Sequence, residues 1–208
     1  RGIQGELVER AHRAVDEPRL TQTERLHQIL AGAQGTAFGR AHGLDRVATL
    51  ADFRSAVPIR GHDQLQPWLE RVAEGEEQVL TRQTVRMLLE TSDTTGQPKH
   101  LPVTDSWAKS VSEAQALWVL GLVREHEEAA RGSALTVVSA ESHASSPGGL
   151  PIGSNTGRMH RAQPWWLRMR YPVPRSVFAL PHPVRQYVVL RFALQADITT
   201  ITTANPST

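Results

Sequence analysis

The sequence predicts an α/β fold, and three short apolar or β-branched segments support that prediction. These segments are QTVRMLLET (83–91), ALTVVSA (134–140) and ITTITT (198–203). Between them lie stretches in which apolar residues recur every three or four positions, the spacing of an amphipathic helix. Strands that alternate with helices are typical of a mostly parallel sheet flanked by helices. We therefore expect this architecture.

The first two strand segments enclose a long predicted helix. Thr104 or Asp105 is its candidate N-cap, and Gly132 can end it after about Arg131. One face of the helix is apolar, formed by Trp107, Val111, Ala114, Trp118 and Leu122. A strand, a loop, a helix and a strand in this order predict a βαβ unit. Its two strands should pair in parallel through a right-handed crossover.

The first 34 residues predict two helices. Apolar residues line one face of each, and Pro18 separates them. Thr21 is a plausible N-cap of the second helix, because Glu24 follows three residues later as in a capping box.

The remaining segments have less regular patterns. The glycine-punctuated stretch 35–44 predicts a loop, and residues 49–74 predict two short helices broken at Pro58. Residues 141–160 are rich in Ser, Gly and Pro and predict a long loop. Residues 181–195 predict a helix before the last strand.

Composition excludes several functional classes. The chain has 208 residues and a formal net charge of +2, which is too small to indicate a nucleic-acid or membrane-surface partner. It contains no cysteine, so disulfides and thiolate catalysis are excluded. No apolar run reaches the ~18 residues of a membrane span, and no signal peptide opens the chain. We expect a cytoplasmic protein, and a piece of a longer one because it starts at Arg1 without a methionine.

The segment TSDTTGQPK (91–99) has the composition of a phosphate-binding loop. Backbone N–H groups in a tight turn can surround an anion, hydroxyl groups add donors, and a lysine adds a mobile positive charge. The spacing differs from that of a Walker A loop. The candidate donors are Thr91, Ser92, Thr94, Thr95, Gly96 and Lys99.

This loop resembles the T-S-G-T-T-G-x-P-K signature of the adenylate-forming (ANL) superfamily, with eight of nine positions matching. The flanking blocks TAFGRAHGL, DFRSAVPIRGHDQLQPWLERVAEGEEQVLT, KHLPVT, YPVPRSVFALP and NPST narrow the resemblance. They are similar to the auxin-responsive acyl acid amido synthetase family of the Gretchen-Hagen type, from about Gln22 to Thr208.

The resemblance implies a domain organisation. Residues 1–208 would form the N-terminal portion of the large domain of an adenylate-forming enzyme, with the remainder beyond Thr208. Residues 1–80 would be a helical lead-in, and residues 81–208 would hold the phosphate loop and the βαβ core. Because the later nucleotide motifs and the small C-terminal domain are missing, we expect the chain to be inactive alone.

The resemblance also implies an activity. ATP would activate a carboxylic acid to an acyl-adenylate, with Mg²⁺ assisting, and an amine or amino acid would then form an amide. The matching loop of the family holds ATP phosphates, which assigns this role to Ser92, Thr94, Thr95, Gly96 and Lys99. The alternative is a non-catalytic nucleotide-binding or interaction domain with a degenerate phosphate loop.

Asp93 is the departure from the family signature, because it stands where the family has glycine. A carboxylate about 4 Å from a phosphate charge costs roughly 4 kcal/mol at an effective dielectric constant of about 20. Three interpretations stay open: the loop tilts Asp93 away, Asp93 helps to hold Mg²⁺, or nucleotide binding is weak.

Other candidate sites have weaker patterns. Ser106 and Lys109 match the S-x-x-K motif of penicillin-binding enzymes, but its companion motifs are missing, so an exposed helix start is the better interpretation. His143 and His160 lack the spacing of a zinc site and are interpreted as surface or loop histidines.

Two further clusters have a functional and a structural interpretation. Arg124 and Glu125 could face an acyl pocket, but a solvated helix face is favoured.

The stretch PWWLRMRYP (164–172) interleaves aromatic residues and arginines, which can stack nucleic-acid bases. We favour tryptophans packed on the core with their arginines in water. The residues concerned are Trp165, Trp166, Arg168, Arg170 and Tyr171.

Overall fold

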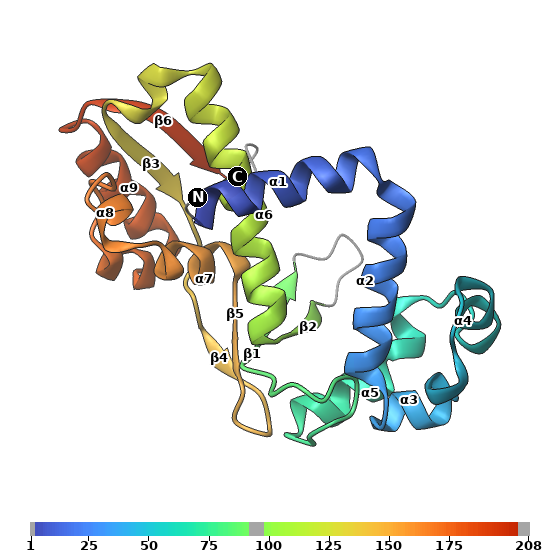
Figure 1. Ribbon diagram of the computed structural model, residues 1–208. Coiled ribbons are helices and arrows are strands. Elements are labelled where there is room, and N and C mark those ends of the chain that lie inside the picture. Colours follow the sequence, from blue (N-terminus) through green and yellow to red (C-terminus); the bar gives the residue numbers. More distant parts are fainter. Residues whose placement is uncertain (1–2, 92–97, 204–208) are drawn as a thin grey trace. The chain divides into compact units, whose positions relative to one another are not determined.

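The computed structural model describes residues 3–91 and 98–203 and confirms the predicted α/β class (Figure 1). The chain divides into two compact units. The first unit comprises Arg1–Leu88, His100–Glu113 and Ser145–Pro151. The second unit comprises Leu89–Lys99, Ala114–Ala144 and Ile152–Thr208.

The first unit begins with a series of helices. They are α1 (Ile3–Asp16), α2 (Pro18–Ala33), α3 (Ala37–Ala41), η1 (Leu44–Arg46), α4 (Leu50–Ala56) and α5 (His62–Ala73). The predicted division at Pro18 is confirmed, because Pro18 is the first residue of α2, where a missing N–H is tolerated. The two helices predicted within 49–74 are also confirmed, as α4 and α5.

The predicted cap of α2 is wrong. Thr21 lies inside the helix and donates its N–H to the carbonyl of Glu17, at 3.1 Å. Glu17 is the N-cap and makes no side-chain capping bond. A capping box occurs instead at α4, where Asp52 N donates to Thr49 Oγ1 (3.1 Å) and Thr49 N donates to Asp52 Oδ2 (2.9 Å).

The predicted loop 35–44 contains the short helix α3. Its N-cap is the fully buried Thr36, whose Oγ1 accepts a hydrogen bond from Gly39 N at 2.9 Å. Gly39 has no room for a Cβ atom, which would lie 2.2 Å from the carbonyl oxygen of Ala33. The sequence pattern suggested a loop because three glycines lie close together, but one of them, Gly39, allows close packing of the helix.

A four-stranded sheet has the order β2-β1-β5-β4. Its strands are β1 (Met87–Thr91), β2 (Lys99–Val103), β4 (Ala144–Ser145) and β5 (Pro151–Gly153). The strand predicted at 83–91 is therefore shorter and begins at the buried Met87. The prediction missed β2, which contains Pro102 and lies at the edge of the sheet, where a missing N–H is tolerated.

The predicted long loop 141–160 is wrong in extent. It contains β4, β5 and the start of α7 (Asn155–Ala162), whose N-cap Ser154 accepts a hydrogen bond from Gly157 N at 3.0 Å. Pro, Gly and Ser mark the turns between these short elements, and short elements leave little periodicity for a sequence pattern.

A parallel pair of strands lies in the second unit. Strand β3 (Ser133–Val137) pairs with β6 (Ile198–Thr203), with Leu135 opposite Ile201. The predicted strand at 198–203 is confirmed. The predicted βαβ unit is wrong, because β1 and β3 belong to different sheets and the parallel partner of β3 is the last strand.

The long helix α6 spans Asp105–Glu125. Thr104 caps it, since its Oγ1 accepts a hydrogen bond from Trp107 N at 3.3 Å. The helix ends before the predicted Arg131, and a 3₁₀ turn, η2 (Glu127–Ala130), follows. Gly132 does not end the helix; its N–H donates to Thr199 Oγ1 of β6 at 3.2 Å.

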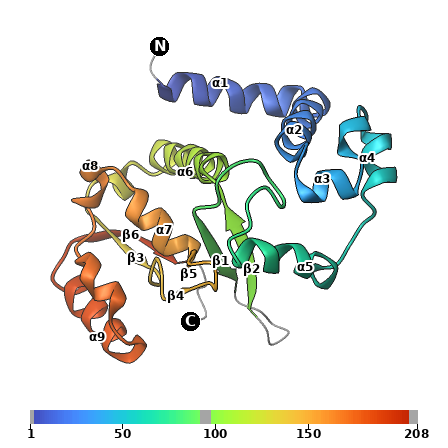
Figure 2. The same cartoon turned by 90° about the horizontal axis from the view of Figure 1, so that it is seen from below.

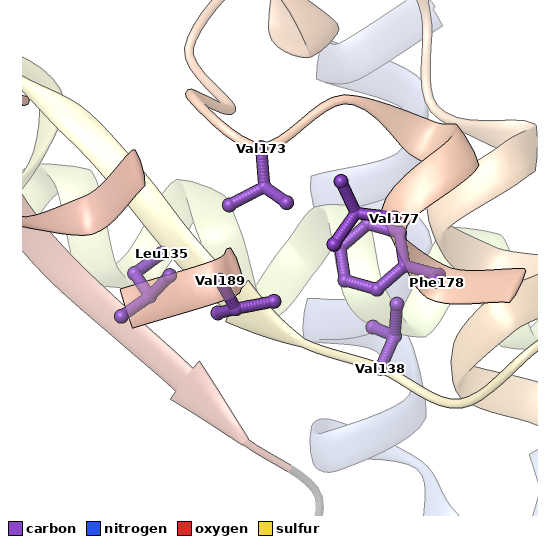
Figure 3. Close-up of a cluster of buried hydrophobic side chains, with 6 residues drawn as sticks. All are labelled: Leu135, Val138, Val173, Val177, Phe178 and Val189. Carbon is purple, nitrogen blue, oxygen red and sulfur yellow. The ribbon is translucent and has the colours of Figure 1, made fainter. Parts of the chain in front are cut away.

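The core of the second unit lies between β3 and α9 (His182–Ala193), which confirms the helix predicted at 181–195. The buried residues are Leu135, Val138, Val173, Val177, Phe178 and Val189 (Figure 3). Val177 and Phe178 come from the 3₁₀ helix η3 (Arg175–Ala179), which follows α8 (Trp165–Arg168). Figure 2 shows α6 and α9 on opposite sides of the β3–β6 pair. Helices therefore cover both faces of these strands, as expected for parallel strands.

Candidate functional site

The described ends of the predicted phosphate loop are Thr91 and Lys99. Thr91 ends β1 and Lys99 begins β2, the neighbouring strand of the sheet. Both residues are half-buried. The other predicted site residues lie outside the described residues; they are Ser92, Asp93, Thr94, Thr95 and Gly96.

A carboxylate–imidazole pair lies beside this end of β1. Glu90 Oε1 is 3.5 Å from His143 Nε2, and Glu90 directly precedes Thr91. The chain places His143 there because its N–H donates to the carbonyl of Ile152 in β5, at 2.9 Å. His143 is thus an exposed loop histidine as predicted, but no sequence signal pointed to its pairing with Glu90.

The second unit contains an apolar cavity of about 180 Å³, hereafter the apolar cavity. It lies between the second half of α6, the β3–β6 pair and α7. Among its lining residues are Gln115, Trp118, Val119, Leu122, Val138, Met159 and His160. Gln115 Oε1 accepts a hydrogen bond from Gln163 Nε2 at 3.3 Å, so these two amides on the wall are already paired with each other.

Arg124 and Glu125 do not belong to this cavity. Both side chains are exposed near the end of α6, and neither lines the wall. The favoured interpretation, a solvated helix face, is therefore confirmed for the described residues. The residues of α6 that do line the cavity recur at helical spacing, at Gln115, Trp118, Val119, Leu122 and Val123.

The predicted arrangement of PWWLRMRYP is wrong for two of its residues. Trp165 is 69% exposed and does not pack on the core. Arg170 is half-buried and donates to the carbonyls of Ala129 (2.7 Å) and Gly132 (2.7 and 3.0 Å). The guanidinium satisfies carbonyls at the end of η2, where no helical partner is available. The side chain of Trp166 lies outside what the structure describes.

His160 is buried, which contradicts its interpretation as a surface histidine. Only 7% of the residue is exposed, and its ring contacts those of Tyr171 (4.8 Å between centroids) and Phe178 (5.1 Å). Its Nε2 is buried and has no hydrogen-bond partner among the described residues. Burial lowers the pKa of His160, and the positive charges of Arg175 and Arg168 lower it further. The imidazole is therefore neutral near pH 7.

The remaining candidate motifs give no site. Ser106 and Lys109 are exposed at the start of α6, as expected for a helix start, and Lys109 lies 3.9 Å from Glu113. Residues 3–91 and 98–203 contain no group of three metal-ligating side chains. Within the same part of the chain, no helix is both long and apolar enough to cross a membrane.

Comparison with known protein families decides the relationship. The model of the GH3 family N-terminal domain matches residues 7–208. The chain belongs to the GH3 family. This confirms the resemblance to the acyl acid amido synthetases.

Curated GH3 relatives are longer than this chain. A jasmonoyl–L-amino acid synthetase, GH3.3, from Oryza sativa subsp. japonica is 28% identical over 172 residues, which cover 81% of this chain and 37% of the relative. An indole-3-acetic acid-amido synthetase, GH3.17, from Arabidopsis thaliana is 37% identical over 87 residues, 40% of this chain and 14% of the relative. The chain therefore spans little more than a third of the rice relative.

Solved GH3 structures share the fold. A GH3.15 acyl acid amido synthetase superimposes with a TM-score of 0.68 at 18% identity, covering 80% of this chain and 29% of that protein. The AtGH3.15 acyl acid amido synthetase in complex with 2,4-DB superimposes with a TM-score of 0.60 at 20% identity, covering 65% of this chain and 24% of that protein. At these identities the likeness establishes the fold of the GH3 N-terminal domain.

Proposed function

We propose that this GH3 domain is part of an acyl acid amido synthetase, a ligase that uses ATP to join a carboxylic acid to an amine or amino acid. Residues 1–208 would be the N-terminal portion of its acyl-adenylating domain, with a helical lead-in over 1–80 and the phosphate loop and catalytic core over 81–208. The match of the family model to residues 7–208 carries the proposal. The curated relatives are named as jasmonoyl and indole-3-acetic acid amido synthetases.

The proposed reaction has two steps. An oxygen of the acid attacks the α-phosphorus of ATP, and pyrophosphate leaves to give the acyl-adenylate. The amine then attacks the acyl carbon, and AMP leaves with the amide formed. The first step develops charge on phosphate oxygens, which oriented donors and a positive charge stabilise. Thr91, Lys99 and the residues between them supply such donors, since threonine and serine hydroxyls and lysine suit a phosphate.

We assign the apolar part of the acid to the apolar cavity. Its volume of about 180 Å³ exceeds that of engineered cavities of roughly 150 Å³ that hold a benzene ring. Trp118, Val119 and Leu122 give it apolar walls, as is typical of small-molecule sites. The site therefore suits an acid whose carbon skeleton is about the size of one ring.

Mg²⁺ would neutralise phosphate charge in the first step, as it does in other phosphoryl-transfer sites. Asp93 could hold it, or the loop could tilt Asp93 away from the phosphates. The affinity for ATP with and without Mg²⁺, measured in wild type and in Asp93→Asn, separates these two ideas. An equal Mg²⁺ dependence in both proteins would exclude Asp93 as a metal ligand.

The test of the proposed function is acid-dependent exchange of pyrophosphate into ATP by the full-length protein, across a panel of carboxylic acids. Lys99→Ala should reduce the exchange rate by about 10²-fold, because a charge that stabilises the transition state is lost. Lys109→Ala is the matched control, since Lys109 is the only other lysine of the chain and is exposed. If no acid supports exchange, even after Asp93→Gly, the enzyme proposal fails.

A second candidate function follows from Asp93 itself. If the aspartate repels phosphate, the domain is a non-catalytic nucleotide-binding or interaction domain. Restoration of exchange by Asp93→Gly in a protein that otherwise shows none would support this candidate.

We propose small molecules as partners, namely a carboxylic acid and an amine or amino acid, with neither a nucleic acid nor a membrane involved. The cytoplasm is the proposed location, since ATP is available there.

A further inference from the structure

A second cavity of the second unit has charged walls; we call it the charged cavity. Its volume is about 260 Å³, and its walls come from the segment after β3, from α7 and from η3. Its lining residues include Val138, Glu141, His160, Arg161, Arg175 and Phe178. None of them belongs to the predicted phosphate loop.

Charges of both signs are held in place on this wall. Arg161 Nη1 donates to Glu141 Oε2 at 2.6 Å. Arg175 Nη2 donates to the backbone carbonyl of Arg161 at 2.9 Å, which orients its guanidinium without neutralising it. One acidic residue and two arginines therefore line the same cavity, and Arg175 has no carboxylate partner among the described residues.

Close backbone packing positions Glu141. A Cβ atom on Gly157 of α7 would lie 2.5 Å from Ser139 O and 2.6 Å from Glu141 N. A Cβ atom on Gly153 would lie 1.6 Å from Glu141 O. The chain can pass this close only because both positions are glycine. The carboxylate is thus attached to a backbone that cannot move without displacing α7.

The charged cavity shares a wall with the apolar cavity. Val138 and His160 line both. Val138 and Phe178 are each 6% exposed and add apolar groups to the lining of the charged cavity. Figure 3 shows these two side chains next to each other. His160 is neutral, so it separates the two cavities without adding charge.

The mixed charges select the chemistry of a ligand. Glu141 disfavours a simple anion such as phosphate, and the two arginines disfavour a simple cation. A zwitterion satisfies both, because a guanidinium pairs with a carboxylate and a carboxylate pairs with an ammonium group. An α-amino acid has these two groups on one carbon, and its side chain can lie on the apolar surface.

We propose that the charged cavity binds the amino-acid acceptor, with Arg175 holding its α-carboxylate, Glu141 its α-ammonium group, and Val138 and Phe178 its side chain. This inference rests on the proposed function, which supplies the need for an acceptor. The shared wall of Val138 and His160 places that acceptor one side chain away from the acid.

The test uses the full-length protein and compares an amino acid with the amine left when its carboxylate is removed, for example leucine and 3-methylbutylamine. Arg175→Gln should raise the KM for the amino acid in amide formation by about 10- to 100-fold, the worth of a hydrogen bond between charged groups. The KM for the amine should change by less than about 3-fold, and Arg175→Lys should restore part of the loss.

Arg191→Gln is the matched control, because Arg191 is an exposed arginine of α9 in the same unit. Equal KM values for the amino acid in wild type and Arg175→Gln would overturn the inference, as would equal increases for amino acid and amine. An increase in the KM for ATP alone would instead assign Arg175 to a phosphate. Acid-dependent pyrophosphate exchange needs no acceptor. If the wild-type protein shows no such exchange, the proposed function is rejected, whereas the acceptor site is tested only by the KM values.

Discussion

At the scale of single residues, burial changes the role of His160. Its Nε2 lies in the interior without a hydrogen-bond partner among the described residues, while its ring packs on Tyr171 and Phe178. A buried polar atom without a partner lowers stability by about 1–3 kcal/mol. Such a group also resists taking up a proton, because a charge in an apolar environment is costly.

The pH dependence of stability follows from this burial. The pKa of His160 lies below its ordinary value of 6.5 in the folded protein, whereas the unfolded chain binds a proton near that value. The free energy of unfolding is therefore undiminished above pH 6.5 and decreases as the pH falls from 6.5 toward the lowered pKa. One proton accounts for up to about 1.4 kcal/mol per pH unit.

His160→Phe should remove this part of the pH dependence, since a phenyl ring keeps the aromatic contacts and takes up no proton. Urea unfolding at several pH values between about 5 and 8 measures it. The same substitution at the exposed His12 is the control. If wild type and His160→Phe lose stability in parallel below pH 6.5, another group is responsible.

At the scale of elements, capping residues and prolines decide where the helices begin, and hydrophobic periodicity does not show these positions. The capping box at Thr49 and Asp52 starts α4, while the similar pattern at Thr21 and Glu24 lies inside α2. Pro18 starts α2 three residues earlier, which leaves Thr21 with a helical neighbour on each side. The same local pattern thus has two outcomes, decided by where the proline falls.

Two glycines in helices should respond in opposite directions to alanine. Gly121 of α6 is exposed, and a Cβ atom there meets no atom within 4 Å, so Gly121→Ala should stabilise the protein by roughly 0.5–1 kcal/mol. Gly157→Ala should destabilise it, since the Cβ atom would lie 2.5 Å from Ser139 O. Midpoints of urea unfolding compare the two variants. A higher unfolding midpoint for Gly157→Ala than for wild type would contradict the close contact between Gly157 and the backbone of Ser139.

At the scale of the whole molecule, the second unit brings together segments that are distant in sequence. Strands β3 and β6 pair, α6 and α9 cover their two faces, and the apolar cavity forms between α6 and the strands (Figure 2). The acid site proposed there depends on the shape of this unit rather than on any one motif.

Filling the apolar cavity should impair binding of the acid. Val119→Phe places a ring where the acid is proposed to lie, so the KM for the acid should rise by about 10-fold or more, with little change in the KM for ATP. Arg124→Gln is the comparison, because Arg124 is exposed on the same helix and does not line the cavity. Steady-state pyrophosphate exchange with the full-length protein measures both. If the KM for the acid is unchanged in Val119→Phe, the acid does not bind in the apolar cavity.

Much of the fold was predictable because local patterns report local preferences. The strand at 198–203, the helix at 181–195 and the division at Pro18 each follow from a continuous segment or a single proline. The family was predictable for a similar reason, since the signature at 91–99 and the blocks around it are contiguous.

By itself, the sequence determined the longer helices, the strand segments that form β1, β3 and β6, the family and the candidate phosphate loop, because contiguous residues carry each of these. Only the tertiary structure decided that β3 pairs with β6, that Glu90 meets His143, and that His160 is buried between two cavities. The physical reason is that strand partners, burial and cavity walls depend on packing between distant segments. Hydrophobic periodicity shows which face of an element is buried and does not name the element that covers it.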